Sequence, residues 1–250
     1  MTQRPIFRLT LLAAFASFLS AAPGWASAAE LYNNGPAVDA NGLSIKPNNA
    51  FTLSFGVQTS SKNAVADDFT VSDASWLIRS IDFFALQNNA TAFTLKEVSW
   101  SILANDANNG PVVASGITPL SDGGLLGYRV SPTTLTSKVR PIYRASADIP
   151  DLSLSAGHYW LRWSMSGSLS SGPWQPPTAD AREGNAQQSI AGSAFGTIQD
   201  QGSLLSVEFP FALQGTVVET AAIPEPSSAA LALLGGLGLA WRLRRKAQAS

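Results

Sequence analysis

Between residues 29 and 222, apolar and polar residues alternate in short segments, and no stretch shows the 3.6-residue period of an amphipathic helix. The clearest segment is 158–165, where Tyr159, Leu161, Trp163 and Met165 would share one face of a strand. The same pattern predicts strands over residues 51–58, 66–71, 76–86, 94–103, 111–115, 142–147, 188–190 and 207–213.

Turn-forming residues separate these segments, as at Asn41-Gly42, Asn108-Asn109-Gly110 and Asp122-Gly123-Gly124. About nine short strands at this spacing predict an all-β fold, an antiparallel β-sandwich that is jelly-roll-like. Pro210 lacks an N–H, so strand 207–213 should lie at a sheet edge or carry a bulge. Residues 166–185 are rich in Ser, Pro and Gly and are expected to form a long surface loop.

The N-terminus has a different pattern. Arg4 and Arg8 precede an apolar run over residues 9–22, and Ala26 and Ala28 follow with the small side chains that signal peptidase requires. We therefore expect a signal helix in residues 1–28, with cleavage after Ala28. A retained N-terminal anchor is the alternative.

The C-terminus contains an apolar run over residues 229–241, which as a helix would be about 20 Å long. A basic cluster follows, made of Arg242, Arg244, Arg245 and Lys246. Basic residues after an apolar segment stay in the cytoplasm, so we expect an inner-membrane helix at about 228–241 with its basic tail, 242–246, inside. The alternative is a C-terminal core helix of a soluble domain.

The same tail resembles a known sorting signal. Pro224, Glu225 and Pro226 precede the apolar run, and this combination with the basic end is similar to the PEP-CTERM family, also catalogued as the ice-binding protein C-terminal domain. The resemblance covers residues 223–250. It implies export in a Gram-negative bacterium, anchoring in the inner membrane, processing by exosortase, and a final place in the cell envelope, outside the cell or in exopolysaccharide.

We expect the middle segment, residues 29–222, to be one exported domain, and its composition limits the partners and chemistry that it can have. It has ten Lys or Arg against sixteen Asp or Glu, a net charge of −6, which argues against nucleic acid as a partner. The chain has no cysteine, so disulfides, thiol nucleophiles and Cys-metal sites are excluded. Phrases at 31–36, 66–71 and 157–161 are similar to phrases in uncharacterised secreted bacterial sandwich domains.

Candidate chemistry is sparse. His158 is the only histidine, and no Gly-x-Ser-x-Gly elbow is present, so we expect no catalytic residues and no cofactor. Asp67 and Asp68 form the densest acidic pair and are the candidate calcium ligands. Their side chains would point to opposite faces of a strand, and the interpretation we favour is a solvated carboxylate or a salt bridge with Arg79 or Arg129.

Tryptophan offers one further chemistry, because aromatic rings stack on sugars. Trp160 faces away from the apolar side of its strand and Trp174 lies in the expected loop, so these two are the candidate glycan contacts, and sugar binding requires them to be exposed and coplanar. The expected function is a non-enzymatic exported protein with a structural or adhesive role. The alternatives are a glycan-binding module and, less favoured, a polysaccharide-acting enzyme.

Overall fold

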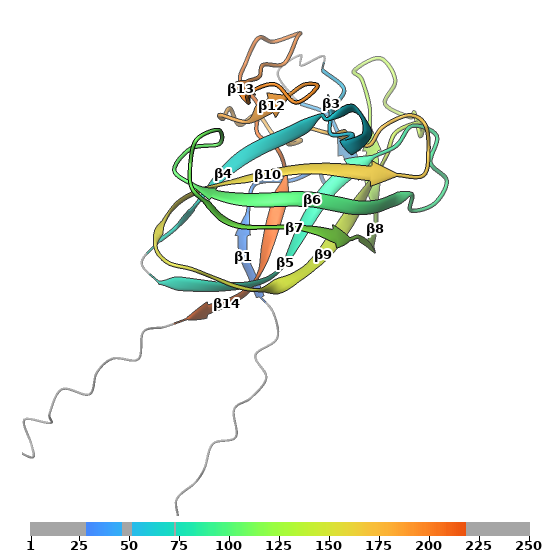
Figure 1. The fold of residues 1–250 in the computed structure, drawn as a ribbon. Coiled ribbons are helices and arrows are strands. Elements are labelled where there is room, and N and C mark those ends of the chain that lie inside the picture. The colour runs from blue at the N-terminus through green and yellow to red at the C-terminus, as the bar shows by residue number, and fades with distance from the viewer. Residues whose placement is uncertain (1–28, 47–51, 73, 219–250) are drawn as a thin grey trace, which may run out of the picture.

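The structure is a computed structural model that describes residues 29–46, 52–72 and 74–218. This part of the chain is all-β and forms two sheets, with one short 3-10 turn, η1 (Thr59–Ser61) (Figure 1). The strands of the first sheet are β1 (Ala29–Asn33), β2 (Leu43–Ser44), β3 (Phe55–Gly56), β5 (Ser75–Leu86), β8 (Ser121–Arg129), β9 (Pro141–Leu154), β11 (Trp174–Gln175) and β14 (Phe211–Val218). The strands of the second are β4 (Ala64–Val71), β6 (Leu95–Ala104), β7 (Val112–Pro119), β10 (Gly157–Gly167), β12 (Gln187–Ser189) and β13 (Gly196–Thr197).

Sheet topology follows the order β1-β14-β5-β9-β8-β2 in the first sheet, and β13-β12-β4-β10-β6-β7 in the second. In the first sheet, β11 also pairs with β5, and β3 pairs with β11. The paired strands are antiparallel except for β2 and β8, which run parallel. The connections from β4 to β5, β5 to β6, β7 to β8 and β9 to β10 each pass from one sheet to the other. Neighbouring segments of sequence are thereby divided between two layers.

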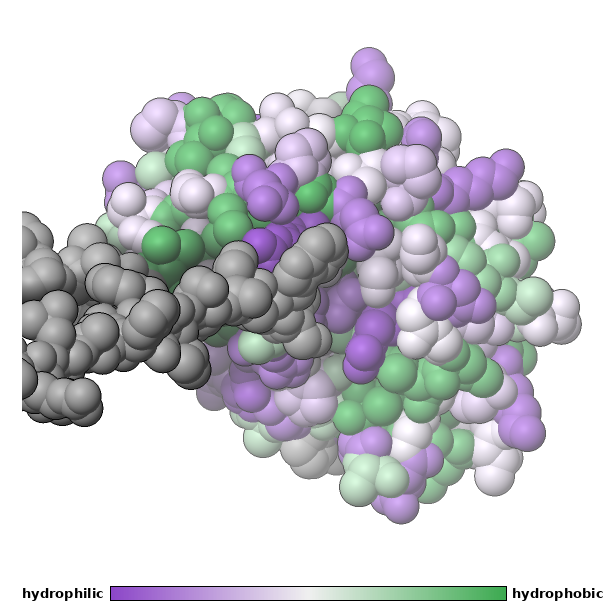
Figure 2. All heavy atoms as spheres, turned by 90° about the horizontal axis from the view of Figure 1, so that it is seen from below, coloured by the Kyte–Doolittle hydropathy of each residue, from purple (hydrophilic) through white to green (hydrophobic). Residues whose placement is uncertain are grey.

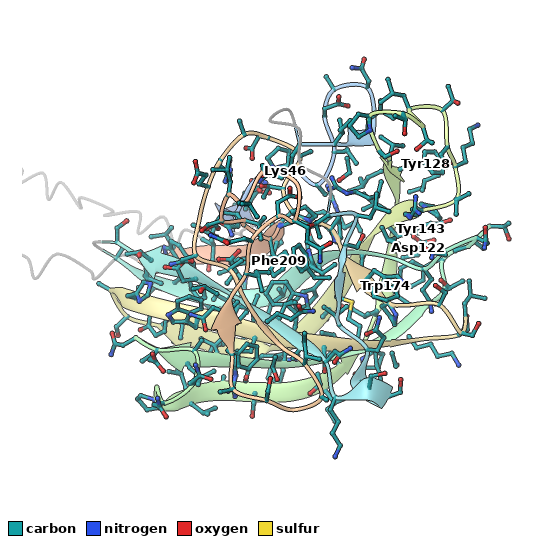
Figure 3. The ribbon with its side chains drawn as sticks, turned by 90° about the horizontal axis from the view of Figure 1, so that it is seen from above. Lys46, Asp122, Tyr128, Tyr143, Trp174 and Phe209 are labelled. Atoms are coloured by element: carbon teal, nitrogen blue, oxygen red, sulfur yellow. The ribbon has the colours of Figure 1, made fainter. Side chains whose placement is uncertain are left out.

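The core lies between the two sheets, where alternation along each strand directs apolar side chains inward. The inward face of β10 is the one that the sequence predicts: Tyr159, Leu161, Trp163 and Met165 all belong to the core cluster. Aromatic rings fill its centre, with Trp163 packed edge-on against Phe209 at 6.0 Å between centroids. Figure 3 shows Phe209 among the side chains between the sheets.

Two local predictions about strands and turns are wrong. Strand 207–213 begins only at Phe211, and β14 lies between β1 and β5 rather than at an edge; Pro210 precedes the ladder, and the bulge comes later, at Gln214 and Gly215. Asp122-Gly123-Gly124 is not a turn between strands but an irregularity within β8, where Gly124 adopts a φ of 99°.

The expected surface loop over residues 166–185 is also only partly correct. This segment includes the short strand β11, and its residues Gln175, Pro176, Pro177 and Thr178 are buried. Gln175 accepts a hydrogen bond from the indole of the core residue Trp163. The segment therefore passes through the interior rather than over the surface alone.

The two ends of the described domain leave it at the same end. β1 pairs antiparallel with β14, with Ala29 opposite Gly215, so the chain enters beside the place where it departs after Val218 (Figure 1). Figure 2 views this end from below and shows polar and apolar side chains exposed together. Val217 and Val218 are exposed here. Any membrane attachment at either terminus would therefore hold the domain by one end.

Both predicted terminal helices lie outside the described residues. These are the signal helix in residues 1–28 and the membrane helix at about 228–241. Within the described ranges, no helix is long and apolar enough to cross a membrane.

Candidate functional site

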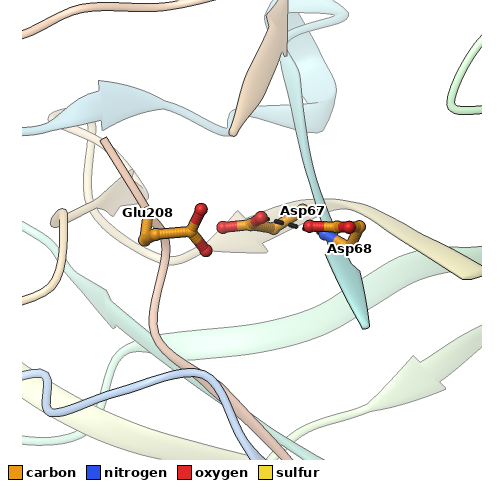
Figure 4. Close-up of side chains that lie close together, drawn as sticks. All are labelled: Asp67, Asp68 and Glu208. Carbon is orange, nitrogen blue, oxygen red and sulfur yellow. Dashed lines mark hydrogen bonds between the residues drawn. The ribbon is translucent and has the colours of Figure 1, made fainter. Parts of the chain in front are cut away.

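Two consecutive carboxylates of β4 meet a third from a distant part of the chain. Asp67 and Asp68 belong to β4, and Glu208 lies in the segment that leads into β14. One carboxylate oxygen from each lies within 4.8 Å of the others, and Figure 4 shows Asp67 between its two neighbours. Asp67 is 0% exposed and Glu208 is 9% exposed, so this acidic cluster is largely closed to solvent.

The local reason is an interrupted ladder. β12 pairs with β4 only from Ala64 to Ala66, so the edge of β4 beyond Ala66 needs other partners. Oδ1 of Asp67 accepts the main-chain N–H of Asp68 at 2.9 Å, and Oδ2 accepts the main-chain N–H of Phe209 at 2.6 Å. The Asp67 carboxyl group thereby joins β4 to the segment before β14.

Glu208 is held in the same manner. Its Oε2 accepts an N–H from the Asn34 side chain at 2.7 Å, and its Oε1 accepts the main-chain N–H of Asn185 at 2.8 Å. The Tyr32 hydroxyl donates to Oδ1 of Asn34 at 2.9 Å, which orients the amide toward Glu208. The acidic cluster is therefore the junction at which β1, β4, the 176–185 segment and the approach to β14 are hydrogen-bonded together.

Burial sets the protonation of this junction. It raises the pKa of Asp67 well above its usual range, and the neighbouring Glu208 carboxylate raises it further. The pKa of Tyr32 rises to about 12, chiefly through burial and then through repulsion from Asp67 and Asp68. A proton held by Asp67 relieves the repulsion between two carboxylates that face each other.

The candidate calcium ligands Asp67 and Asp68 are thus brought together, with Glu208 as a third oxygen donor. Calcium accepts six to eight oxygen ligands, and these three side chains are the ones that could hold a cation here. Both oxygens of Asp67 and both of Glu208, however, already accept N–H groups. The chemistry of the donor set fits a hydrogen-bonded junction better than a cation cage.

The salt bridges expected for the acidic pair are wrong. Arg79 pairs with Asp151, and the buried Arg129 donates to the main-chain carbonyls of Ser44, Thr52 and Leu53. Asp68 pairs instead with His158, whose Nε2 contacts its Oδ2. Within the described residues, the imidazole of His158 forms this one side-chain hydrogen bond. Its ring also packs edge-on against Trp160, with 6.1 Å between the two ring centroids.

The outer face of the second sheet carries an open groove of about 460 Å³. Register places Arg162, Ser101 and Ser115 side by side across β10, β6 and β7, and Ser164, Ser99 and Ile117 in the adjacent row. Phe195 also lines the groove. Small side chains at four of these positions leave the face hollow between the larger Arg162, Phe195 and Ile117.

The two candidate tryptophans are not brought together. Trp160 lies on β10 in the second sheet, is 6% exposed and packs with Ala66, Ala107 and Phe195. Trp174 lies on β11 in the first sheet, is half-buried against a separate cluster, and is labelled in Figure 3. The exposed, coplanar pair that sugar binding would need from them does not form.

Comparison with known proteins addresses the C-terminus. Residues 222–246 match the family model described as the PEP-CTERM protein-sorting motif. The chain carries a PEP-CTERM sorting signal. This signal is the one that exosortase recognises, so the protein is exported, anchored at its C-terminus and processed by that enzyme. Among curated proteins, none matches the chain.

The residues assigned to sorting lie outside the described part of the chain. They are the PEP-CTERM motif Pro224, Glu225 and Pro226, the basic cluster Arg242, Arg244, Arg245 and Lys246, and the cleavage residues Ala26 and Ala28. The residues that sequence reasoning missed are Glu208 and the groove around Arg162. The groove had a signal in the sequence: Ser99, Ser101, Arg162 and Ser164 are the polar positions of two alternating strands.

Proposed function

We propose that this protein is a non-enzymatic envelope or exopolysaccharide-matrix component whose jelly-roll-like sandwich has a structural or adhesive role. The observation that carries the proposal is the pairing of β1 with β14, which brings Ala29 and Val218 to one end of the domain. A domain that follows a signal peptide at one terminus and precedes a sorting signal at the other can then extend its far end away from the membrane. β3, β12 and β13 lie at that far end in Figure 1.

The burial of the carboxylates in the acidic cluster supports the proposal that the protein is not an enzyme. A glycosidase needs two carboxyl groups that flank a bound sugar, roughly 5–10 Å apart on an accessible face. Asp67 is 0% exposed and offers no surface to a ligand, and Asp68 is engaged by His158. The acidic cluster therefore lacks the access that the reaction requires.

The experiment is expression of the full chain in a host that has exosortase. The protein should lose mass that corresponds to the segment after the PEP motif, and replacement of Pro224, Glu225 and Pro226 by alanine should prevent that loss. A matched control replaces three exposed residues inside the described domain, Pro132, Thr133 and Thr134, by alanine. Mass spectrometry and fractionation of membrane, envelope and medium provide the readout, and an unprocessed protein in the presence of exosortase contradicts the proposal.

A second candidate function is glycan binding, and the groove on the second sheet favours it. An open, polar hollow with two apolar side chains at its border, Phe195 and Ile117, can accept the hydroxyls and the C–H face of a sugar. This assignment moves the sugar contacts from Trp160 and Trp174 to the groove.

A further inference from the structure

Among the residues that the structure describes, the charged side chain of Arg162 has no charged partner. Its Nε donates to Oγ of Ser101 at 3.0 Å and its Nη1 to the main-chain carbonyl of Ala107 at 3.2 Å. The guanidinium carbon lies 5.5 Å from the centroid of the Phe195 ring. Within the described residues, the ion pairs are those of Arg79, His158 and Arg182, and Arg162 forms none.

Neutral acceptors leave much of this guanidinium unsatisfied. The group has five N–H donors, of which the two bonds above use two. Partial burial lowers the pKa of Arg162 from its ordinary value, yet an arginine remains charged at neutral pH. Two acidic residues on segments next to its contacts have other partners: Asp68 of β4 contacts His158, and Asp106, which precedes Ala107, accepts the main-chain N–H groups of Asn108 and Asn109.

The groove supplies hydroxyl groups beside this charge. Ser99, Ser101, Ser115 and Ser164 all line it. The hydroxyl of Ser101 accepts from Arg162, and that of Ser164 accepts from Thr59 at 3.2 Å. Among the described residues, no side-chain hydrogen bond engages Ser99 or Ser115, so both hydroxyls are available to a ligand.

The size of the groove and the apolar side chains at its border further limit the class of ligand that fits it. Its volume of about 460 Å³ falls within the range of small-molecule sites, roughly 300–1,000 Å³. Ile117 is 70% exposed at one border and Phe195 lies at another, so apolar surface flanks the polar floor. A ligand that fits has an anionic group for Arg162, hydroxyls for the serines, and a C–H face for the border.

We propose that this groove binds an anionic sugar, with the carboxylate of a uronic acid residue on Arg162 and its hydroxyls on Ser99 and Ser115. The inference rests on the glycan-binding candidate above and names its ligand class. A guanidinium and a carboxylate form charge-assisted hydrogen bonds, which are stronger than neutral ones. The net charge of −6 over residues 29–222 gives no overall attraction to a polyanion, so binding depends on the local positive charge of Arg162.

The test uses the full chain in detergent micelles and isothermal titration calorimetry with two probes, an alginate hexasaccharide and maltohexaose as the neutral comparison. The wild-type chain should bind the alginate probe with a Kd below about 1 mM, and maltohexaose at least about tenfold more weakly. Arg162→Gln removes the charge and should weaken alginate binding at least about tenfold. Arg79→Gln, at a partly exposed arginine on the other sheet, should leave it unchanged.

A second variant guards against a folding defect in Arg162→Gln. Ser115 is exposed on the edge strand β7, so Ser115→Glu adds a negative charge to the groove without disturbing the core. It should also weaken alginate binding at least about tenfold, and circular dichroism should show both variants folded. Added NaCl should weaken binding in the wild type, because salt screens an open ion pair.

Three results overturn the inference. If the wild type binds neither probe, the groove is no sugar site, while processing and fractionation of the full chain still test the proposed envelope location separately. If alginate binding survives both Arg162→Gln and Ser115→Glu, the contact lies elsewhere. If both probes bind equally well and Ser115→Trp blocks both, glycan binding stands but the anionic class is wrong.

Discussion

The main-chain N–H of Phe209 donates to the carboxyl group of Asp67, a residue 142 positions away. Phe209 itself packs in the core against Trp163, so this bond links the polar junction to the packed interior. The carboxyl group of Asp67 substitutes for the strand partner that β4 lacks beyond Ala66. A residue that resembles a catalytic or metal-binding acid in the sequence thus completes the hydrogen bonding of a sheet edge.

The acidic cluster predicts that stability decreases as pH rises. The folded pKa of Asp67 is raised, so its contribution is fully present below the unfolded pKa of about 4 and is lost as pH rises through the folded value. Glu208→Gln removes the neighbouring charge and should flatten this decrease. Thermal unfolding between about pH 4 and pH 8 measures both slopes, and equal slopes in the two proteins would contradict the assignment.

Tyr32 predicts a second pH dependence at alkaline pH. Its pKa is raised to about 12 in the folded protein, so the stability it contributes is present below about pH 10 and is lost between pH 10 and 12. Tyr32→Phe also removes the bond to Asn34 and should cost about 1 kcal/mol at neutral pH.

Urea titrations at about pH 8 and about pH 10.5, on either side of the ordinary tyrosine pKa, provide the measurement for Tyr32→Phe. The difference in unfolding free energy between wild type and variant should change between the two pH values. A constant difference would show that the hydroxyl does not titrate differently on folding.

A substitution at Gly184 tests whether the position of the Glu208 carboxylate matters to the fold. A Cβ at this position would lie 1.3 Å from Oε1 of Glu208, so Gly184→Ala must displace the carboxylate that binds Asn34 and Asn185. We expect a loss of about 2–4 kcal/mol in the free energy of unfolding. The measurement is chemical denaturation monitored by tryptophan fluorescence.

The matched control for Gly184→Ala is Gly196→Ala. A Cβ at Gly196 meets no atom within 4 Å, so this change should alter stability by less than about 0.5 kcal/mol. If the two glycine variants have equal stability, the position of Glu208 does not matter to the fold.

A substitution at Trp163 measures how much free energy of unfolding is lost when a polar group in the core has no hydrogen-bond partner. Its indole Nε1 donates to Oε1 of Gln175 at 3.1 Å, and both side chains are buried. Trp163→Phe keeps an aromatic ring but leaves the amide oxygen without this donor, so we expect a loss of about 1–3 kcal/mol. Ile190→Ala, at an exposed position, is the control and should be nearly neutral in the same urea titration.

The local alternation of apolar and polar residues predicts much of the architecture. The alternation in residues 158–165 predicted which side chains of β10 enter the core, because successive side chains of a strand point to opposite faces wherever the strand lies. The sorting signal can also be identified from sequence, because exosortase recognises a short linear motif that does not depend on contacts with distant residues. The prediction of a strand over residues 207–213 is wrong at its start because the alternation continues through Glu208 and Pro210, where no ladder forms.

The all-β class, the inward face of β10 and the sorting signal at the C-terminus follow from sequence alone, because each depends on residues a few positions apart. Two features emerge only in the folded chain: the meeting of Glu208 with Asp67, and the position of Arg162 in a serine-lined groove where no described carboxylate pairs with it. Both depend on how strands far apart in sequence pair and pack. That register is set by the combined burial of the whole core, and no single segment contains it.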